Sequence, residues 1–380
     1  MTLLDSTDET ITRSLFSELT VERSALGEDA FGRMIVVERK RTERSGKPFL
    51  LMLLEAGNHQ GSGKNGKPLD TMVSTLLSST RETDVVGWYK EWTTVGVIFT
   101  GLLVDDKHSI LNTILTRVST ALRDKLTFEQ FNQVSISFHF FPDHWDEDTS
   151  GRPSNRALYP DLSRRDDQRR PLLGIKRVMD IIGSLLALII CAPLLATIAL
   201  AIKVSSKGPV FFKQKRVGHY GKVFTFLKFR SMHLNNDPSV HREYVANLIA
   251  GRAVRLPSNG NGDGVYKLTN DKRITQVGKF LRRSSLDELP QFLNVLKGDM
   301  SLVGPRPAIP YEVASYQTWH RRRILEVKPG ITGLWQVNGR NRIEFDEMVR
   351  LDLQYAKGWS PWLDIKILLR TPRAVLRGAH

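Results

Sequence analysis

The chain has 380 residues, enough for two or three domains, and its 41% apolar and 25% charged residues can build hydrophobic cores, which excludes global disorder. The net charge of +15 is unevenly placed: residues 1–170 carry 22 basic and 25 acidic side chains, whereas residues 171–380 carry 33 and 15, so the second half should bind an anionic partner. The single cysteine, Cys191, excludes an intrachain disulfide and a cysteine zinc cluster, and the chain opens without a signal-peptide pattern, which predicts a cytoplasmic N-terminus.

The first half of the chain has the pattern of an α/β domain. Residues 1–30 are polar and predict a mobile leader, and residues 31–142 then alternate helical and strand periodicity. The expected helices are Phe31–Ser45, Met72–Thr83 and His108–Lys125, and the expected strands are Phe49–Leu54, Thr94–Phe99 and Val134–Phe140. Residues 143–170 are rich in Asp, Arg, Pro and Ser, which predicts an extended or disordered linker.

An uncharged segment, Ile181–Ile202, has the roughly 20 residues that a transmembrane helix needs, and a plain spanning helix is one interpretation. Pro193 in its middle predicts a kink or break, because proline lacks the N–H donor and crowds the preceding turn. Basic residues flank both ends, whereas the positive-inside rule expects them on one side. We therefore favour a re-entrant membrane helix over residues 178–203, with its break at Pro193 and both ends in the cytoplasm.

Downstream of this segment the sequence becomes rich in residues that bind phosphate. Alternating apolar residues up to Phe229 predict a hairpin with a glycine-containing turn, closed by Lys228 and Arg230, and residues 255–264 form a polar, glycine-rich loop. Two adjacent carboxylates, Asp287 and Glu288, then fall in or beside the first turn of a predicted helix.

The start of that helix has two interpretations: Ser285 forms a capping box with Glu288, or Asp287 is its own N-cap. In either case the helix dipole favours ionised carboxylates, and the neighbouring Arg282 and Arg283 make the pair suitable for a magnesium-bound diphosphate. The alternative is structural, because acidic residues are common in a first helical turn.

Three later features complete the pattern. Arg306 lies between two prolines, so a rigid turn could present its guanidinium to a phosphate with little loss of entropy. Residues 328–337 place two glycines around Trp335, either as a shelf for a base or sugar or, as the better interpretation, as turns around a core tryptophan. Leu363–Leu376 mixes aliphatic and basic residues after Trp359 and Trp362, as interfacial segments do, although an ordinary surface helix fits as well; two prolines predict two short helices.

These stretches, taken together, resemble a known family. The motifs are GPVFFKQKRVG, FTFLKFRSM, RRSSLDELPQFLNVLKGDMSLVGPRP, KPGITGLWQVNGR and WLDIKILLRT. In this order, over about residues 172–375, they resemble the bacterial sugar transferases, which are monotopic phosphoglycosyl transferases acting on polyprenyl phosphate. Many members carry Ser-Pro at the membrane break, where this chain has Ala192-Pro193.

The resemblance implies a chemistry for each site residue. Asp287 is the expected nucleophile on the β-phosphorus of a UDP-sugar; it releases UMP, and undecaprenyl phosphate then attacks the sugar-phosphoryl aspartate. Glu288 is expected to hold Mg²⁺, the implied cofactor. We expect Arg306, Arg282, Arg283, Lys228 and Arg230 to bind phosphate oxygens. The implied enzyme initiates exopolysaccharide, capsule or O-antigen assembly at the bacterial inner membrane, with its domains facing the cytoplasm.

Residues 31–142 weakly resemble a degenerate diguanylate-cyclase (GGDEF) domain. Where such domains carry a Gly-Gly-acid-Glu-Phe turn this chain reads Tyr89-Lys90-Glu91-Trp92-Thr93, so we expect a regulatory or oligomerisation module without cyclase activity. The expected fold class is α/β: a ferredoxin-like, nucleotidyl-cyclase-like domain, then a membrane-associated catalytic domain over residues 171–380 with a re-entrant helix and interfacial amphipathic helices.

The alternative function is a non-catalytic, membrane-tethered protein whose basic half binds anionic lipid or nucleic acid. The acidic pair argues against a nucleic-acid partner, because without a metal it would repel phosphates. The expected partners are therefore a UDP-sugar, undecaprenyl phosphate and inner-membrane lipid, and a homo-oligomer is compatible with the sequence. A scaffold that has lost its activity is a third interpretation, which no motif supports.

Overall fold

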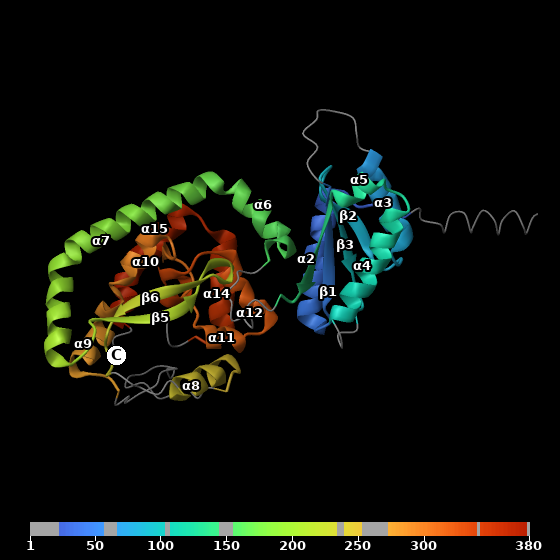
Figure 1. Cartoon of the computed structure of the whole chain (residues 1–380). Helices are drawn as coiled ribbons and strands as arrows, with labels where there is room; N and C mark the ends of the chain where they lie inside the picture. The colour runs from blue at the N-terminus through green and yellow to red at the C-terminus, as the bar shows by residue number, and fades with distance from the viewer. Residues whose placement is uncertain are drawn as a thin grey trace, which may run out of the picture. The chain divides into compact units, whose positions relative to one another are not determined.

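The computed structural model describes residues 23–56, 67–102, 107–143, 155–233, 239–252, 273–339 and 343–377. The chain forms two compact units (Figure 1). The first unit comprises Met1–Asp143 and Ala157–Asp161, and the second comprises His144–Arg156 and Leu162–His380. The predicted loop at residues 255–264 lies outside the described residues.

The N-terminal unit is built on one antiparallel sheet with the strand order β2-β3-β1-β4. Its strands are β1 (Phe49–Ala56), β2 (Val85–Lys90), β3 (Thr94–Phe99) and β4 (Val134–Phe141), and its helices are α2 (Glu28–Ser45), α3 (Lys67–Ser79), α4 (Lys107–Arg123) and α5 (Phe128–Asn132). The central strand β1 is buried over its first six residues, because helices cover it on both faces. The three predicted strands and three predicted helices are all present; β2 and α5 are additional.

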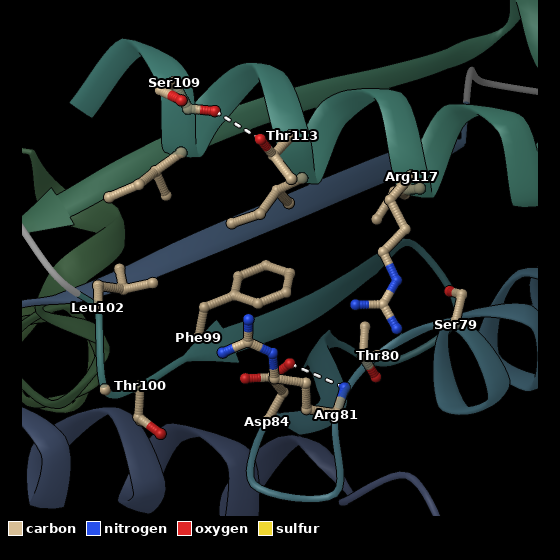
Figure 2. A pocket seen from close by; sticks show the side chains of 14 residues that line it. Ser79, Thr80, Arg81, Asp84, Phe99, Thr100, Leu102, Ser109, Thr113 and Arg117 are labelled. Atoms are coloured by element: carbon tan, nitrogen blue, oxygen red, sulfur yellow. Dashed lines mark hydrogen bonds between the residues drawn. The ribbon is translucent and has the colours of Figure 1, made fainter. Parts of the chain in front are cut away.

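A cavity of about 280 Å³ lies in this unit, between the end of α3, the end of β3 and α4 (Figure 2). Arg81 and Arg117 line it together with the ring of Phe99 and several hydroxyl groups. The hydroxyl of Ser79 is buried and has no hydrogen-bond partner among the described residues. The lining therefore mixes charged, hydroxyl and apolar side chains.

The predicted mobile leader is wrong for residues 23–30. Leu26 forms a parallel bridge to Gly87, and its amide donates to the carbonyl of Val86 at 3.0 Å. Arg23 donates to the carbonyls of Leu77 and Thr80 at 2.7 and 2.9 Å. These residues join the sheet because their backbone and arginine find partners there; residues 1–22 lie outside the described part.

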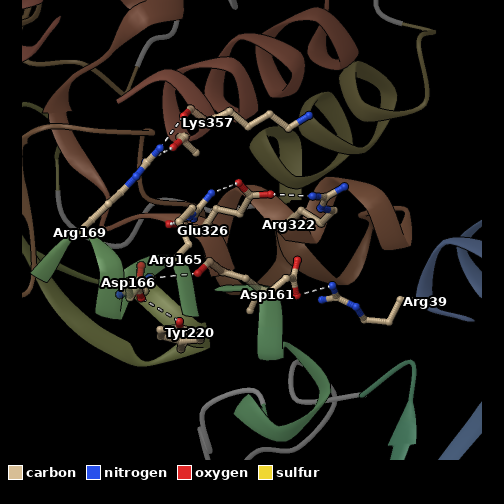
Figure 3. Close-up of polar contacts among 12 residues, drawn as sticks. Arg39, Asp161, Arg165, Asp166, Arg169, Tyr220, Arg322, Glu326 and Lys357 are labelled. Carbon is tan, nitrogen blue, oxygen red and sulfur yellow. Dashed lines mark hydrogen bonds and ion pairs between the residues drawn. The ribbon is translucent and has the colours of Figure 1, made fainter. Parts of the chain in front are cut away.

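The predicted disordered linker is also wrong for residues 155–170, which form the 3₁₀ turn η1 (Arg156–Leu158) and helix α6 (Pro160–Gln168). In the first unit Arg39 binds Asp161 at 2.6 Å. In the second unit the α6 residue Arg165 binds Glu326 at 3.0 Å, and Tyr220 donates to Asp166 at 3.2 Å (Figure 3). The segment is ordered because its many charges are paired.

The second unit combines short sheets with helices around several small cores. Its helices are α7 (Arg170–Ser205), α8 (Ser239–Ile249), α9 (Gln276–Ser284), α10 (Gln291–Lys297), α11 (Pro310–Ala314), α12 (Thr318–Glu326), α13 (Leu334–Asn338), α14 (Phe345–Gly358) and α15 (Pro361–Arg377). The predicted hairpin is present as β5 (Phe211–Val217) and β6 (Val223–Phe229), joined by the 3₁₀ turn η2 (His219–Gly221). A second sheet pairs β7 (Ser301–Val303) with β8 (Gly330–Thr332) in parallel, and the turn η3 (Leu286–Glu288) carries the acidic pair.

Helix α7 is one continuous helix of 36 residues, so the predicted break into two arms is replaced by a bend (Figure 1). Pro193 lies inside it, and one missing hydrogen bond bends a helix without ending it. Within the described residues, α7 alone is long and apolar enough to cross a membrane. Its middle is exposed: Ile189 is 62% and Ile190 is 75% exposed.

Both ends of α7 pack on the second unit. Near the first end, Lys176 binds Asp364 of α15 at 2.5 Å, and Arg177 donates to the carbonyls of Val295 and Leu296, each at 2.7 Å. Near the second end, Ile198 and Ile202 pack in a core with residues of β6 and α9. Each end also keeps an exposed apolar face, since Ile175 is 50% and Leu200 is 66% exposed.

Helix α15 is also continuous through its proline, Pro372, so the prediction of two short helices is wrong. One face is buried, with Asp364 3% and Ile367 1% exposed. The other face carries Trp362 and Leu369, which are 61% and 75% exposed. The helix is therefore amphipathic, as the sequence predicts.

Candidate active site

The acidic pair lies on η3, between α9 and α10. Ser285 ends α9 in the left-handed conformation, with φ 57°, and the chain turns sharply there. Ser285 is both the C-cap of α9 and the residue that precedes the 3₁₀ turn, but its side chain makes no capping bond there, so the predicted capping box is absent; Asp287 lies inside the turn, so its predicted role as N-cap is wrong. The next helix starts only after Pro290, which suits a helix start because it has no N–H to donate.

Lys228 of β6 binds both carboxylates. Its ammonium lies 2.7 Å from Glu288 Oε1 and 3.7 Å from Asp287 Oδ2. Asp287 is 7% exposed, and this burial raises the pKa of its carboxyl group, an effect that the charge of Lys228 opposes. Glu288 adds negative charge and raises the same pKa, whereas Arg282 and Arg306 lower it. The buried carboxylate therefore faces a concentration of positive charge.

Arg306 is fixed by the backbone on either side of it. Gly304 donates to Thr332 O and Gly330 donates to Pro305 O, each at 2.8 Å, so β8 holds the turn from one side. These strands approach so closely that a Cβ on Gly304 would lie 2.3 Å from the carbonyl oxygen of Lys328. Glycine is therefore required at this contact, and the side chain of Arg306 itself is exposed.

The segment 328–337 is a support for this turn. Trp335 is 7% exposed and belongs to α13, which confirms the interpretation as turns around a core tryptophan instead of a shelf for a base. Arg323 adds a second support, since it donates to the carbonyl of Arg306 at 3.3 Å and pairs with the buried Asp352 at 2.7 Å.

The remaining predicted phosphate ligands differ in their placement. The charge of Arg282 lowers the pKa of Asp287. Arg283 is exposed, and among the described residues it makes no contact with the acidic pair. Arg230 is 4% exposed and donates to the carbonyls of Lys207 and Ser206 at 3.0 and 2.8 Å. Its guanidinium therefore caps the C-terminal end of α7, and the structure gives it this role in place of the predicted phosphate contact.

Sequence reasoning missed two residues that shape the site. Asn294 of α10 is fully buried; its side chain accepts from Leu227 N at 3.0 Å and donates to Thr225 O at 2.7 Å, which ties β6 to α10. Arg216 of β5 is 5% exposed and donates to Pro307 O at 2.8 Å. The sequence offered one signal for Arg216: it is a basic residue in a predicted strand, where it lies two residues from Gln214 and therefore on the same face.

Residues 172–378 match the family described as "Bacterial sugar transferase". The chain is 47% identical over 204 residues to "Undecaprenyl-phosphate galactose phosphotransferase" of Salmonella typhimurium, covering 53% of this chain and 40% of that protein. It is 39% identical over 214 residues to "Exopolysaccharide production protein ExoY" of Sinorhizobium fredii, covering 56% of this chain and 91% of that protein. This chain thus spans less than half the length of the first of these relatives.

The N-terminal unit was compared with solved structures. "The crystal structure of a DGC protein from Thermotoga maritima" is similar at 20% identity, with a TM-score of 0.25, over 32% of this chain and 85% of that chain. The degenerate GGDEF interpretation of residues 31–142 stays a prediction.

Proposed function

The chain belongs to the bacterial sugar transferase family, and from this premise we propose that it transfers a sugar 1-phosphate from a UDP-sugar to undecaprenyl phosphate, with release of UMP. The observation that supports this proposal most is the buried Asp287, which lies beside Lys228 and within electrostatic reach of Arg306 and Arg282. A carboxylate held among positive charges can attack an anionic diphosphate, because those charges offset the repulsion between the two.

The reaction proceeds in two displacements at phosphorus. An oxygen of Asp287 forms a bond to the β-phosphorus, and the bond from that phosphorus to the bridging oxygen breaks, so UMP leaves with the electron pair. An oxygen of the lipid phosphate then attacks the same phosphorus and breaks its bond to Asp287. Each displacement is easier than a direct transfer between two anions, which is the advantage of covalent catalysis.

The acidic pair also fits a Mg²⁺ ion. Asp287 and Glu288 supply adjacent carboxylate oxygens, and the side chain of Glu288 is 25% exposed, so an ion could reach it. Mg²⁺ is commonly bound by one or two carboxylates and takes its other ligands from substrate phosphate and water, so these two side chains would be its protein ligands. Bound Mg²⁺ would neutralise charge on the diphosphate, and Lys228 would then share Glu288 with it.

The membrane topology follows from α7. Because both of its ends make contacts with the same unit and its apolar middle is exposed, we infer that it enters and leaves the cytoplasmic leaflet of the inner membrane. Cysteine labelling tests this in a Cys191→Ser background, with Leu172→Cys and Lys207→Cys placed one at a time at the two flanks. Equal labelling from the cytoplasmic side of sealed vesicles supports the re-entrant helix, and labelling from opposite sides overturns it.

The activity test uses full-length protein in nanodiscs with undecaprenyl phosphate, Mg²⁺ and a panel of UDP-sugars. We expect UMP release with at least one sugar and none from Asp287→Asn. Ser284→Ala serves as the control, because the Ser284 hydroxyl bonds only to the carbonyls of its own helix, and it should retain activity. No UMP release with any sugar from folded wild-type protein would refute the proposal.

For the N-terminal unit we propose a regulatory or oligomerisation module. Its elements follow the βαββαβ order of ferredoxin-like domains. The cavity between α3 and α4 favours the regulatory role, because it offers a small ligand both arginines and an apolar wall. Thr113→Trp, which fills the cavity, should change transferase activity in the full chain; unchanged activity and unchanged oligomeric state would contradict the proposal.

A further inference from the structure

Arg216 is a buried cation with no carboxylate partner. Its Nε donates to Gln214 Oε1 at 2.9 Å, its Nη1 donates to Pro307 O at 2.8 Å, and its guanidinium lies 5.1 Å from the centre of the Phe226 ring. Across the described part of the chain no acidic side chain lies within ion-pair distance of it, and its Nη2 has no hydrogen-bond partner. Burial of a charged group in this way is costly unless an anion neutralises it.

The other buried arginines show the contrast. Arg323 pairs with Asp352 at 2.7 Å and Arg39 pairs with Asp161 at 2.6 Å. Arg230 is buried at the negative end of the α7 dipole, where carbonyl oxygens surround it. Arg216 donates hydrogen bonds to one amide oxygen and one carbonyl oxygen, and Glu312 acts on its charge only from beyond ion-pair distance, so the cost of burying the charge is only partly offset.

Arg216 and Lys228, the lysine that binds the acidic pair, lie against the same ring: the Arg216 guanidinium is 5.1 Å and Lys228 Nζ is 5.6 Å from the centre of Phe226. Burial first, and then the like charge of Arg306, lower the pKa of Arg216 to about 10, whereas Glu312, and after it Tyr311 and Glu288, raise it. Arg306 in turn acts on Asp287. One turn holds both arginines, because Arg216 binds the carbonyl of Pro307, the residue that follows Arg306. Two like charges are therefore held together within electrostatic reach of the nucleophile.

We propose that Arg216 and Arg306 form one phosphate site, which first holds the phosphate of the departing UMP and then the phosphate of the lipid acceptor. This inference rests on the proposed function. In an in-line displacement the leaving group departs opposite the nucleophile, so UMP leaves on the side away from Asp287. The lipid phosphate must displace Asp287 from the same phosphorus, and it therefore enters on the side that UMP has left. A single arginine pair thus serves both half-reactions.

The test compares full-length wild type, Arg216→Met, Arg216→Lys and the control Lys215→Met in nanodiscs of one lipid composition. Lys215 is the neighbouring residue on β5, is exposed and carries the same charge, so its replacement controls for net charge. The measurements are equilibrium binding of UMP and of uridine, inhibition by UMP against varied undecaprenyl phosphate, and Tm.

The expected results follow from loss of a charge-assisted hydrogen bond. Arg216→Met should weaken UMP binding by about 10- to 100-fold and leave uridine binding unchanged. The UMP affinity of Arg216→Lys should lie between those of Arg216→Met and the wild type, and the UMP affinity of Lys215→Met should match that of the wild type. UMP should compete with undecaprenyl phosphate in the wild type. The Tm of Arg216→Lys should stay close to that of the wild type, which separates a loss of binding from a loss of folding.

Unchanged UMP binding in Arg216→Met would overturn the inference, and so would an equal loss of UMP and uridine in a folded Arg216→Lys, because that result assigns Arg216 a structural role. Inhibition by UMP that is not competitive with the lipid phosphate would overturn the shared site. Failure of the proposed function has a different signature: wild-type protein would then release no UMP from any UDP-sugar.

Discussion

Replacement of Asn294 by alanine should destabilise the second unit and disturb the acidic pair. Asn294 is fully buried, and its truncation leaves Leu227 N–H and Thr225 C=O without partners. Each buried group that loses its partner costs about 1–3 kcal/mol, so the expected loss is roughly 4 kcal/mol. At about 2–4 °C per kcal/mol for a domain of this size, the Tm should fall by roughly 8–16 °C.

The assay is thermal unfolding of full-length protein in one detergent, followed by UMP release at a temperature where the variant is folded. Activity should also fall, because the two lost bonds hold β6 at Thr225 and Leu227, immediately before Lys228. Lys297→Ala is the control: Lys297 is exposed on the same helix, and surface substitutions usually stay within about 0.5 kcal/mol. If Asn294→Ala unfolded at the wild-type temperature, the role given to this amide would be refuted.

Three further substitutions test other contacts. Lys228→Met removes a charge that lowers the pKa of Asp287, so that pKa should rise and the acid limb of the kcat/KM profile for UMP release should move to higher pH; an unmoved limb would show that Lys228 does not act on Asp287. Lys176→Met leaves Asp364 buried and unpaired and should cost about 3–5 kcal/mol in chemical denaturation, whereas a loss below about 1 kcal/mol would mean that this ion pair does not fasten α7. Burial lowers the pKa of His219 to about 4, so the folded state resists its protonation and the free energy of unfolding should decrease as the pH falls from about 6.5 to about 4. His219→Gln should reduce this decrease. If the wild type and the variant lost stability identically over this pH range, the role given to His219 would be contradicted.

The acidic pair and the proline-flanked arginine could be identified as candidate site residues from the sequence, because each is recognised from residues that are adjacent in the chain. Lys228 binds both Asp287 and Glu288, and Arg306 lies within electrostatic reach of Asp287. The way the chain reaches them could not be predicted. The Ser-x-x-Glu spacing typifies a capping box. Here its serine, Ser285, is in the left-handed conformation and ends the previous helix.

The arginines show the limit of sequence reasoning more clearly. Arg216 and Arg230 both lie on or beside the strands of one hairpin, and residue type alone suggests phosphate for either. Tertiary packing separates them: the end of α7 provides carbonyl oxygens for Arg230, while Arg216 reaches the turn of Arg306. Pro193 gives a similar lesson, because a proline predicts a disturbance of the helix, and the surrounding contacts decide between a bend and a break.

The most direct test of the account is to trap the covalent step. Wild-type protein and Asp287→Asn are incubated with the UDP-sugar that supports turnover, without undecaprenyl phosphate, and UMP release and intact mass are measured together. The account predicts one equivalent of UMP and a mass increase of one sugar phosphate on the wild type, located to the peptide that contains Asp287, and neither change in the variant. UMP release that requires the lipid phosphate from the start, with no adduct on the wild type, would contradict it.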